Sequence, residues 1–144
     1  MFTNSNQPTI CLIDDDRIYQ FTARRIIELV NPAQRVLNFF NGKEAIDFFR
    51  QPNLAVDTLP DIIFLDINMP VMNGWEFLED YNAIKNMFPK NIAIYMVSSS
   101  IDEKDRLRSQ HFGVTDYIEK PINQQMMRQI LDASLAHMKT ENAQ

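Results

Sequence analysis

Cysteine and glycine are scarce in this sequence, which contains one cysteine and three glycines among 144 residues. The single cysteine, Cys11, cannot form an intramolecular disulfide, and its place within an apolar run predicts a buried, unreactive thiol. The absence of disulfides fits a reducing compartment, so we expect a cytoplasmic location. The lack of a glycine-rich segment also argues against a loop that cradles phosphate with backbone amides.

Long apolar runs and an excess of basic residues are missing as well. The apolar runs have about the length of strands, well short of the ~20 residues that a membrane span needs. Residues 1–8, MFTNSNQP, lack the basic and apolar regions of a signal peptide. We therefore expect no membrane insertion. The 14 basic and 19 acidic residues give a net charge of −5, which argues against direct binding of nucleic acid.

The sequence alternates short apolar runs with longer amphipathic stretches, a pattern typical of β–α units. We predict strands at residues 9–13, 35–40, 62–65, 92–97 and 116–119. We predict helices at residues 17–30, 43–50, 74–85, 102–113 and 123–139, the last two including their capping residues. This alternation indicates an α/β fold: a doubly wound, five-stranded parallel sheet of order 2-1-3-4-5, flavodoxin-like, with helices on both faces.

The length of 144 residues, with 45% apolar and 23% charged residues, is typical of one globular domain. We expect this domain to span residues 9–139. Residues 1–8 and 140–144 are expected to form short flexible tails, with no output domain after the last helix. The connection at residues 51–60 is long and polar, and we expect it to lengthen one surface edge only.

Polar side chains stand at the ends of four predicted strands. Residues 14–16 are three consecutive aspartates after the first strand; Asp66, Ser98 and Lys120 end the third, fourth and fifth. Any one of these features is ordinary, and Asp16 is expected simply to cap the first helix. In a sheet of order 2-1-3-4-5, however, these strand ends meet at the edge where doubly wound folds bind their ligands. Together they predict a functional crevice.

The chemistry of this crevice indicates a divalent cation. Asp14, Asp15 and Asp66 would repel one another when packed together, and at least one pKa would rise. A hard cation such as Mg²⁺, or Mn²⁺ in its place, relieves that repulsion and takes waters or phosphate oxygens as further ligands. Lys120 adds a positive charge and Ser98 a hydrogen bond, a combination typical of sites that bind phosphoryl oxygens.

The segments ICLIDDD, DIIFLDINMPVMNGWEFL, YMVSSS and DYIEKP occur in this order on these strands. In this respect the chain resembles the receiver domain of two-component response regulators, over about residues 9–139. The resemblance implies that Asp66 is the phosphoacceptor. It also implies that Asp15 and Asp66 bind the metal through their side chains, Asn68 through its backbone carbonyl, and Asp14 through water.

Further roles follow from the same resemblance. Ser98 and Tyr117 match the family's switch pair, and Lys120 matches the lysine that binds the phosphoryl group. A cis peptide bond from Lys120 to Pro121 is implied as well. The residues that flank the attacking water, and so tune the rate of dephosphorylation, are Asn68 and Ser100. Such a domain is no general enzyme, because it catalyses only its own phosphorylation and dephosphorylation.

The partners implied by the resemblance are a histidine kinase or a histidine phosphotransfer protein as donor, and an unknown protein target downstream. Ile18, Tyr19 and Phe21 span too wide an arc of their helix to be wholly buried, so a contact with the donor is expected there. Met126 and Met127 are adjacent, so both cannot face the core. One of them is either a partner contact or an ordinary surface methionine.

Three alternatives use similar residues. A haloacid-dehalogenase-type phosphatase has Asp-x-Asp at its nucleophile, whereas this chain has Asp66 followed by Ile67 and Asn68, so the general acid is missing. A flavin- or nucleotide-binding module needs a loop that cradles phosphate after the first strand, where this chain has aspartates. A degenerate receiver would have lost the acceptor, the acidic pair or the lysine, and all of these are present.

Overall fold

The computed structural model of the chain describes residues 8–32, 34–100 and 102–142, with side chains up to His137. Its centre is one five-stranded, all-parallel sheet of order β2-β1-β3-β4-β5. The strands are β1 (Ile10–Ile13), β2 (Val36–Phe39), β3 (Ile62–Asp66), β4 (Ala93–Ser98) and β5 (Asp116–Glu119). The predicted fold class and strand order are confirmed.

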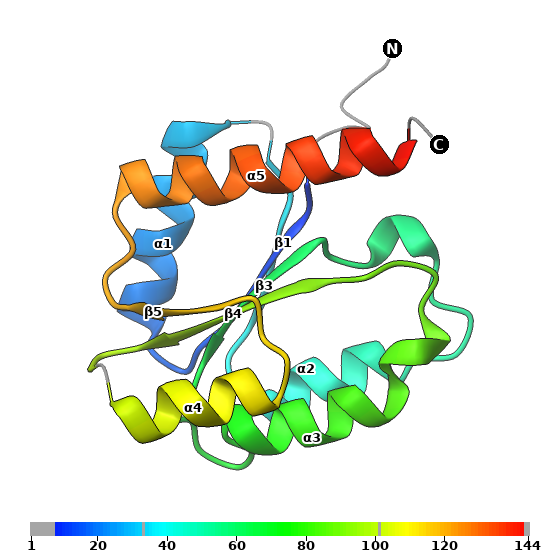
Figure 1. Cartoon of the computed structure of the whole chain (residues 1–144), viewed down its shortest axis with the longest axis vertical. Coiled ribbons are helices and arrows are strands. Elements are labelled where there is room, and N and C mark those ends of the chain that lie inside the picture. The colour runs from blue at the N-terminus through cyan, green and yellow to red at the C-terminus, as the bar shows by residue number, and fades with distance from the viewer. Residues whose placement is uncertain (1–7, 33, 101, 143–144) are drawn as a thin grey trace.

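Helices cover both faces of the sheet (Figure 1). One face carries α1 (Arg17–Val30) and α5 (Gln124–Asn142); the other carries α2 (Gly42–Phe49), α3 (Gly74–Ile84) and α4 (Glu103–His111). Short 3₁₀ turns, η1 (Val56–Thr58) and η2 (Lys85–Met87), lie before β3 and after α3. The last helix continues three residues past the predicted end at Lys139, and residues 1–7 of the predicted tail lie outside the described chain.

The two central strands are buried on both faces. Every residue of β1 and β3 is buried, because each of these strands has a neighbour on both sides and helices above and below. Alternate side chains enter two apolar clusters: Cys11 and Ile63 face α2 and α3, whereas Leu12 and Phe64 face α1 and α5. The thiol of Cys11 is fully buried, and this burial raises its pKa, as expected for an unreactive cysteine.

Polar residues fix where the helices begin and end. The Asp16 carboxylate accepts hydrogen bonds from the first turn of α1, and Asp102 and Asn123 do the same for α4 and α5. Asn73 and Glu76 form a reciprocal capping box at α3. Gly113 follows α4 with a φ of 75°, a left-handed conformation that favours glycine. These caps place the β–α loops, which carry the site.

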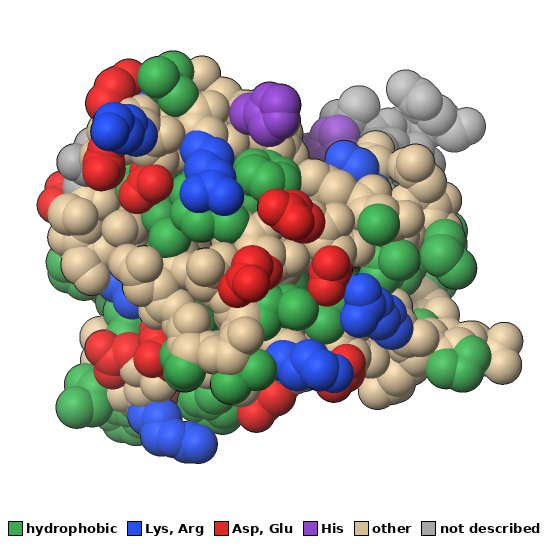
Figure 2. Space-filling model, turned by 90° about the horizontal axis from the view of Figure 1, so that it is seen from below, with side chains coloured by type: hydrophobic (Ala, Val, Ile, Leu, Met, Phe, Trp, Pro, Cys, Tyr) green, Lys and Arg blue, Asp and Glu red, His purple; other side chains and the backbone are tan. Residues whose placement is uncertain are grey.

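The face formed by α2, α3 and α4 carries basic and acidic side chains interspersed with one another (Figure 2). None of the helices in the described ranges combines the length and the apolar character needed to cross a membrane.

Candidate functional site

Three carboxylates converge at the carboxyl end of the sheet. Asp14 and Asp15 directly follow β1, and Asp66 is the last residue of the adjacent β3, paired in register so that Ile13 lies beside Leu65. One oxygen of each carboxylate lies within 4.8 Å of the other two. Asp14 and Asp66 are buried, whereas Asp15 is exposed. The predicted meeting of these residues is confirmed.

Lys120 brings a positive charge into the same cluster. Its Nζ lies 2.8 Å from Asp14 Oδ2 and 3.5 Å from Asp66 Oδ1. The peptide bond from Lys120 to Pro121 is cis, as the resemblance implied. The Lys120 backbone N–H donates to the carbonyl of Ser98 over 2.7 Å, so the ends of β4 and β5 are joined beside the carboxylates.

Burial and charge shift the pKa values of this cluster. Burial, with a contribution from the Asp14 charge, raises the pKa of Asp66 to about 7 despite the opposing effect of Lys120. Burial also raises the pKa of Asp14, although the hydrogen bond from Lys120 opposes the rise. Burial lowers the pKa of Lys120, but its contacts with Asp14 and Asp66 outweigh that effect and hold it above its usual value. Ionising Asp66 beside the negative charge of Asp14 is therefore costly unless a further cation is bound nearby.

The cluster offers oxygen ligands of the kind that hard cations prefer. Mg²⁺ binds through one or two carboxylates and completes its octahedral shell with waters and phosphate oxygens. Asp14, Asp15 and Asp66 provide such a set at one edge of the sheet. The raised pKa of Asp66 gives an independent reason for a cation here, because a nearby positive charge would favour the ionised carboxylate.

Ser98 is the last residue of β4, and Tyr117 is the second residue of the neighbouring β5, opposite Met96; both Ser98 and Tyr117 are buried. The Ser98 hydroxyl accepts a hydrogen bond of 3.3 Å from the backbone N–H of Ser100. The Tyr117 hydroxyl donates to the carbonyl of Ser100 over 3.2 Å. The backbone of the β4–α4 loop thus contacts both residues, while the Ser100 side chain is exposed.

The β3–α3 loop is packed tightly against the end of β3. The Gly74 N–H donates to the carbonyl of Ile67 over 2.8 Å, and a Cβ on Gly74 would lie 2.5 Å from the carbonyl oxygen of Asp66. Asn68 is exposed, two residues after Asp66. Val71 has a φ of 70°, a left-handed conformation that is strained for a β-branched residue.

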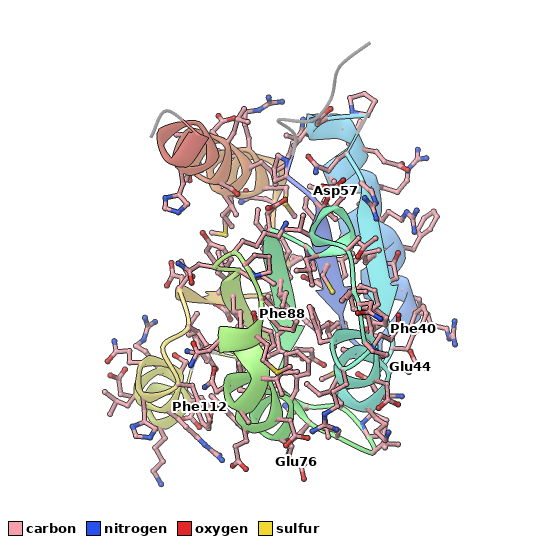
Figure 3. The ribbon with its side chains drawn as sticks, turned by 90° about the vertical axis from the view of Figure 1, so that its right-hand side faces the viewer. Phe40, Glu44, Asp57, Glu76, Phe88 and Phe112 are labelled. Carbon is pink, nitrogen blue, oxygen red and sulfur yellow. The ribbon has the colours of Figure 1, made fainter. Side chains whose placement is uncertain are left out.

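Trp75, the second residue of α3, connects this loop with α4. Its ring stacks on Phe112 with 5.8 Å between centroids, and the Arg108 guanidinium lies 4.6 Å from its ring centroid. Figure 3 shows Phe112 between α4 and α3. The fluorescence of Trp75 should therefore respond to the position of α4.

Two residues of α1 belong to the site although the sequence reasoning did not place them there. Tyr19 is only partly exposed, and its ring centroid lies 4.4 Å from Lys120 Nζ. Gln20 is buried, and its side-chain amide donates to the carbonyls of Asp14 and Phe39 over 3.0 and 2.8 Å. The spacing of Gln20, Ala23 and Ile27 predicts a buried stripe, but the chemistry of its first member could not be read from that pattern.

Some of the residues predicted to lie at the surface of α1 and α5 are exposed, and others are buried. Ile18 and Phe21 are 79% and 67% exposed, whereas Tyr19 turns inward and does not share their surface. Met127 is fully buried, and Met126 is the surface methionine of the pair.

Comparison with known proteins identifies the family. A family model of the response regulator receiver domain matches residues 10–132. The chain belongs to the response regulator receiver family. Members of this family are mainly signalling modules of two-component systems, and they bind Mg²⁺ through a cluster of aspartates.

Individual relatives agree with this placement. The chain is 27% identical over 135 residues to the sensor histidine kinase CheAY of Helicobacter pylori, covering 92% of this chain and 16% of that protein. It spans less than half the length of the first curated relatives that it matches. A two-component response regulator from Cytophaga hutchinsonii superposes with a TM-score of 0.76 at 27% identity, covering 90% and 98% of the two chains. The phosphorylated cyanobacterial phytochrome response regulator RcpA gives 0.70 at 26% identity, covering 88% and 90%.

Proposed function

We propose that this receiver domain accepts a phosphoryl group on Asp66 and returns it to water or to a partner. The main support is the position of Asp66: it is buried, lies within 4.8 Å of the carboxylates of Asp14 and Asp15, and has Lys120 Nζ 3.5 Å from its Oδ1. A solved relative, RcpA, is described as phosphorylated. In the proposed step an Asp66 oxygen forms a bond to phosphorus while the P–N bond of a phosphohistidine breaks, and its electron pair stays on the departing imidazole.

We assign the divalent cation, Mg²⁺ or Mn²⁺, to Asp15 and Asp66 as direct side-chain ligands, to the Asn68 carbonyl, and to Asp14 through water. When bound, the ion neutralises charge on the carboxylates and on the incoming phosphoryl oxygens. The support is the all-oxygen donor set and the raised pKa of Asp66, which must be ionised to act as a nucleophile.

The protein's own groups would then stabilise the phosphoryl oxygens. Lys120 can supply an ammonium, and Ser98 a hydroxyl from the end of β4. When Ser98 turns toward a phosphoryl oxygen, its hydrogen bond with the Ser100 N–H is lost, and the β4–α4 loop must adjust. Tyr117 contacts the same loop through the Ser100 carbonyl, so we propose that Ser98 and Tyr117 couple the site to the surface of α4, β5 and α5.

The proposed donor is a histidine kinase or a histidine phosphotransfer protein, and the proposed target is a protein that recognises the switched surface. Ile18 and Phe21 are exposed on α1 close to the site, which suits an apolar contact with the donor. Met126, which is 36% exposed at the start of α5, is a candidate contact for either partner.

The proposal is tested by modification with a small phosphodonor. Wild type incubated with phosphoramidate and Mg²⁺ is expected to gain one phosphoryl mass in an intact-mass measurement, and Asp66→Asn is expected to gain none. Omitting Mg²⁺ should abolish the adduct in wild type. Asp132→Asn, on the exposed side of α5, serves as the matched control and should react like wild type. An adduct that persists in Asp66→Asn refutes the assignment.

We further propose that Asn68, and not Ser100, positions the water that hydrolyses the phosphorylated form. The Ser100 side chain is short and exposed, and its contacts with Ser98 and Tyr117 use its backbone. Ser100→Ala should therefore change the dephosphorylation rate less than about twofold, whereas Ser100→Glu should speed it severalfold by offering a longer acceptor for the water's proton. Loss of the adduct is followed by mass over time. A tenfold slowing in Ser100→Ala, about 1.4 kcal/mol in the barrier, would assign the water to Ser100.

A further inference from the structure

The ammonium of Lys120 is enclosed by three groups, and one of them is an aromatic ring. Asp14 Oδ2 lies 2.8 Å and Asp66 Oδ1 3.5 Å from Nζ, while the centroid of the Tyr19 ring lies 4.4 Å from the same atom. A cation within about 6 Å of a ring centroid is attracted by the negative face of the ring. Tyr19 therefore contributes to the place where this cation sits.

Tyr19 is held firmly in that position by its own helix. It is the third residue of α1, and its N–H donates to the Asp16 cap over 3.1 Å. Its side chain packs against the apolar cluster between the sheet, α1 and α5. The Lys120 side chain is intrinsically flexible, so a fixed ring beside its ammonium reduces the volume in which it can move.

The Tyr19 hydroxyl is buried and makes no hydrogen bond to the described residues. Burial, together with the charges of Asp14 and Asp66, raises the pKa of this phenol, so it remains neutral and adds no negative charge to the site. The feature that faces Lys120 is therefore the ring and not an ionised oxygen.

We propose that Tyr19 is a positioning residue, whose ring holds the Lys120 ammonium beside Asp66 for contact with the phosphoryl group. This inference rests on the proposed function of Asp66. Phenylalanine has the same ring without the hydroxyl and should replace Tyr19. Leucine is apolar but smaller and has no ring face, and it should not replace Tyr19.

The test measures the rate of Asp66 phosphorylation by phosphoramidate at saturating Mg²⁺. Tyr19→Phe should react within about twofold of wild type, and Tyr19→Leu about five- to tenfold more slowly, as expected for one cation–ring contact. In the background of Lys120→Ala, Tyr19→Leu should cause no further loss. A merely structural role would produce the same loss with or without the lysine, so the double-mutant cycle separates the two roles.

An NMR measurement tests the geometry independently of phosphorylation. The Lys120 Hε protons should be displaced upfield by the ring in wild type and Tyr19→Phe, and should lose this displacement in Tyr19→Leu. An absence of displacement in wild type, a normal rate in Tyr19→Leu, or equal losses in the Phe and Leu variants each overturn the proposal. If Tyr19→Leu does not fold, Tyr19→Met provides the ringless variant. If wild type takes no phosphoryl group, the proposed function fails, while the NMR result still decides whether Tyr19 holds Lys120.

Discussion

Replacing Asp66 by asparagine should stabilise the metal-free protein above pH 7 and change its stability little near pH 4. The pKa of Asp66 is raised from 3.8 to about 7, first by burial and then by the Asp14 charge. The folded protein therefore holds a proton on Asp66 that the unfolded chain releases at lower pH. The stability that this proton provides is fully present below about pH 4 and is lost as the pH rises to about 7. Asparagine, which is neutral at every pH, avoids that loss.

The size of the stabilisation by Asp66→Asn follows from the pKa shift of Asp66. About 3 pKa units correspond to roughly 4 kcal/mol at 1.36 kcal/mol per unit, which we take as an upper bound because Asp66 interacts with both Asp14 and Lys120. Urea unfolding of wild type and Asp66→Asn in EDTA, between pH 4 and pH 8, measures it. The difference in unfolding free energy between the two proteins should increase with pH and level off above pH 7.

Magnesium provides a second contrast for the same pair of proteins. Because binding to the folded state stabilises it, Mg²⁺ at pH 8 should stabilise wild type more than Asp66→Asn, which lacks one of the proposed ligands. Asp132→Asn, at an exposed position on α5, should follow wild type at every pH. A difference between wild type and Asp66→Asn that is the same at pH 4 and pH 8 would show that burial of this carboxylate carries no charge penalty.

The fold could be predicted from the sequence because several independent sequence signals indicate the same elements. Strands that are covered on both faces read as continuous apolar runs, such as residues 62–65, and the intervening helices force parallel crossovers. Caps such as Asp16 and Asp102 then fix the helix starts. Boundaries were less accessible: β2 is shorter by one residue at each end than predicted, because strand ends depend on which neighbours remain in register.

The sequence predicted those residues of the site whose positions depend on the strand order alone. The strand order itself brings Asp14, Asp66 and Lys120 to one edge, so their meeting required no knowledge of side-chain directions. The contact of Tyr19 with Lys120 depends instead on how α1 is rotated over the sheet, which a helical pattern defines only to within about one residue. Tyr19 and the exposed Phe21 lie about 200° apart around the helix, so the periodicity predicts that both cannot face the sheet, but it does not predict which one contacts Lys120.

No pattern in the sequence predicts the tight packing of Gly74 against Asp66. Because of this packing, we expect substitution of Gly74 to cause a large loss of stability. A Cβ on Gly74 would lie 2.5 Å from the Asp66 carbonyl oxygen and 3.0 Å from the Ile67 Cα. Both are backbone atoms, so they cannot move away as a flexible side chain could. Gly74→Ala is therefore expected to destabilise the protein by about 3 kcal/mol, at the upper end of overpacking costs. Urea unfolding at constant pH measures this loss.

Gly113→Ala is the matched control for Gly74→Ala, because its cost has a different origin. Gly113 has a φ of 75°, and a Cβ there would meet no atom within 4 Å. Only the left-handed backbone opposes alanine, at a cost of roughly 1–2 kcal/mol, and the site should react normally. In Gly74→Ala the start of α3 must move away from the carbonyl of Asp66. The folded fraction of this variant should therefore also accept the phosphoryl group of phosphoramidate more slowly than the folded fraction of Gly113→Ala. Equal stability losses with unchanged reaction rates in the two variants would mean that the loop relaxes around Gly74 without displacing Asp66.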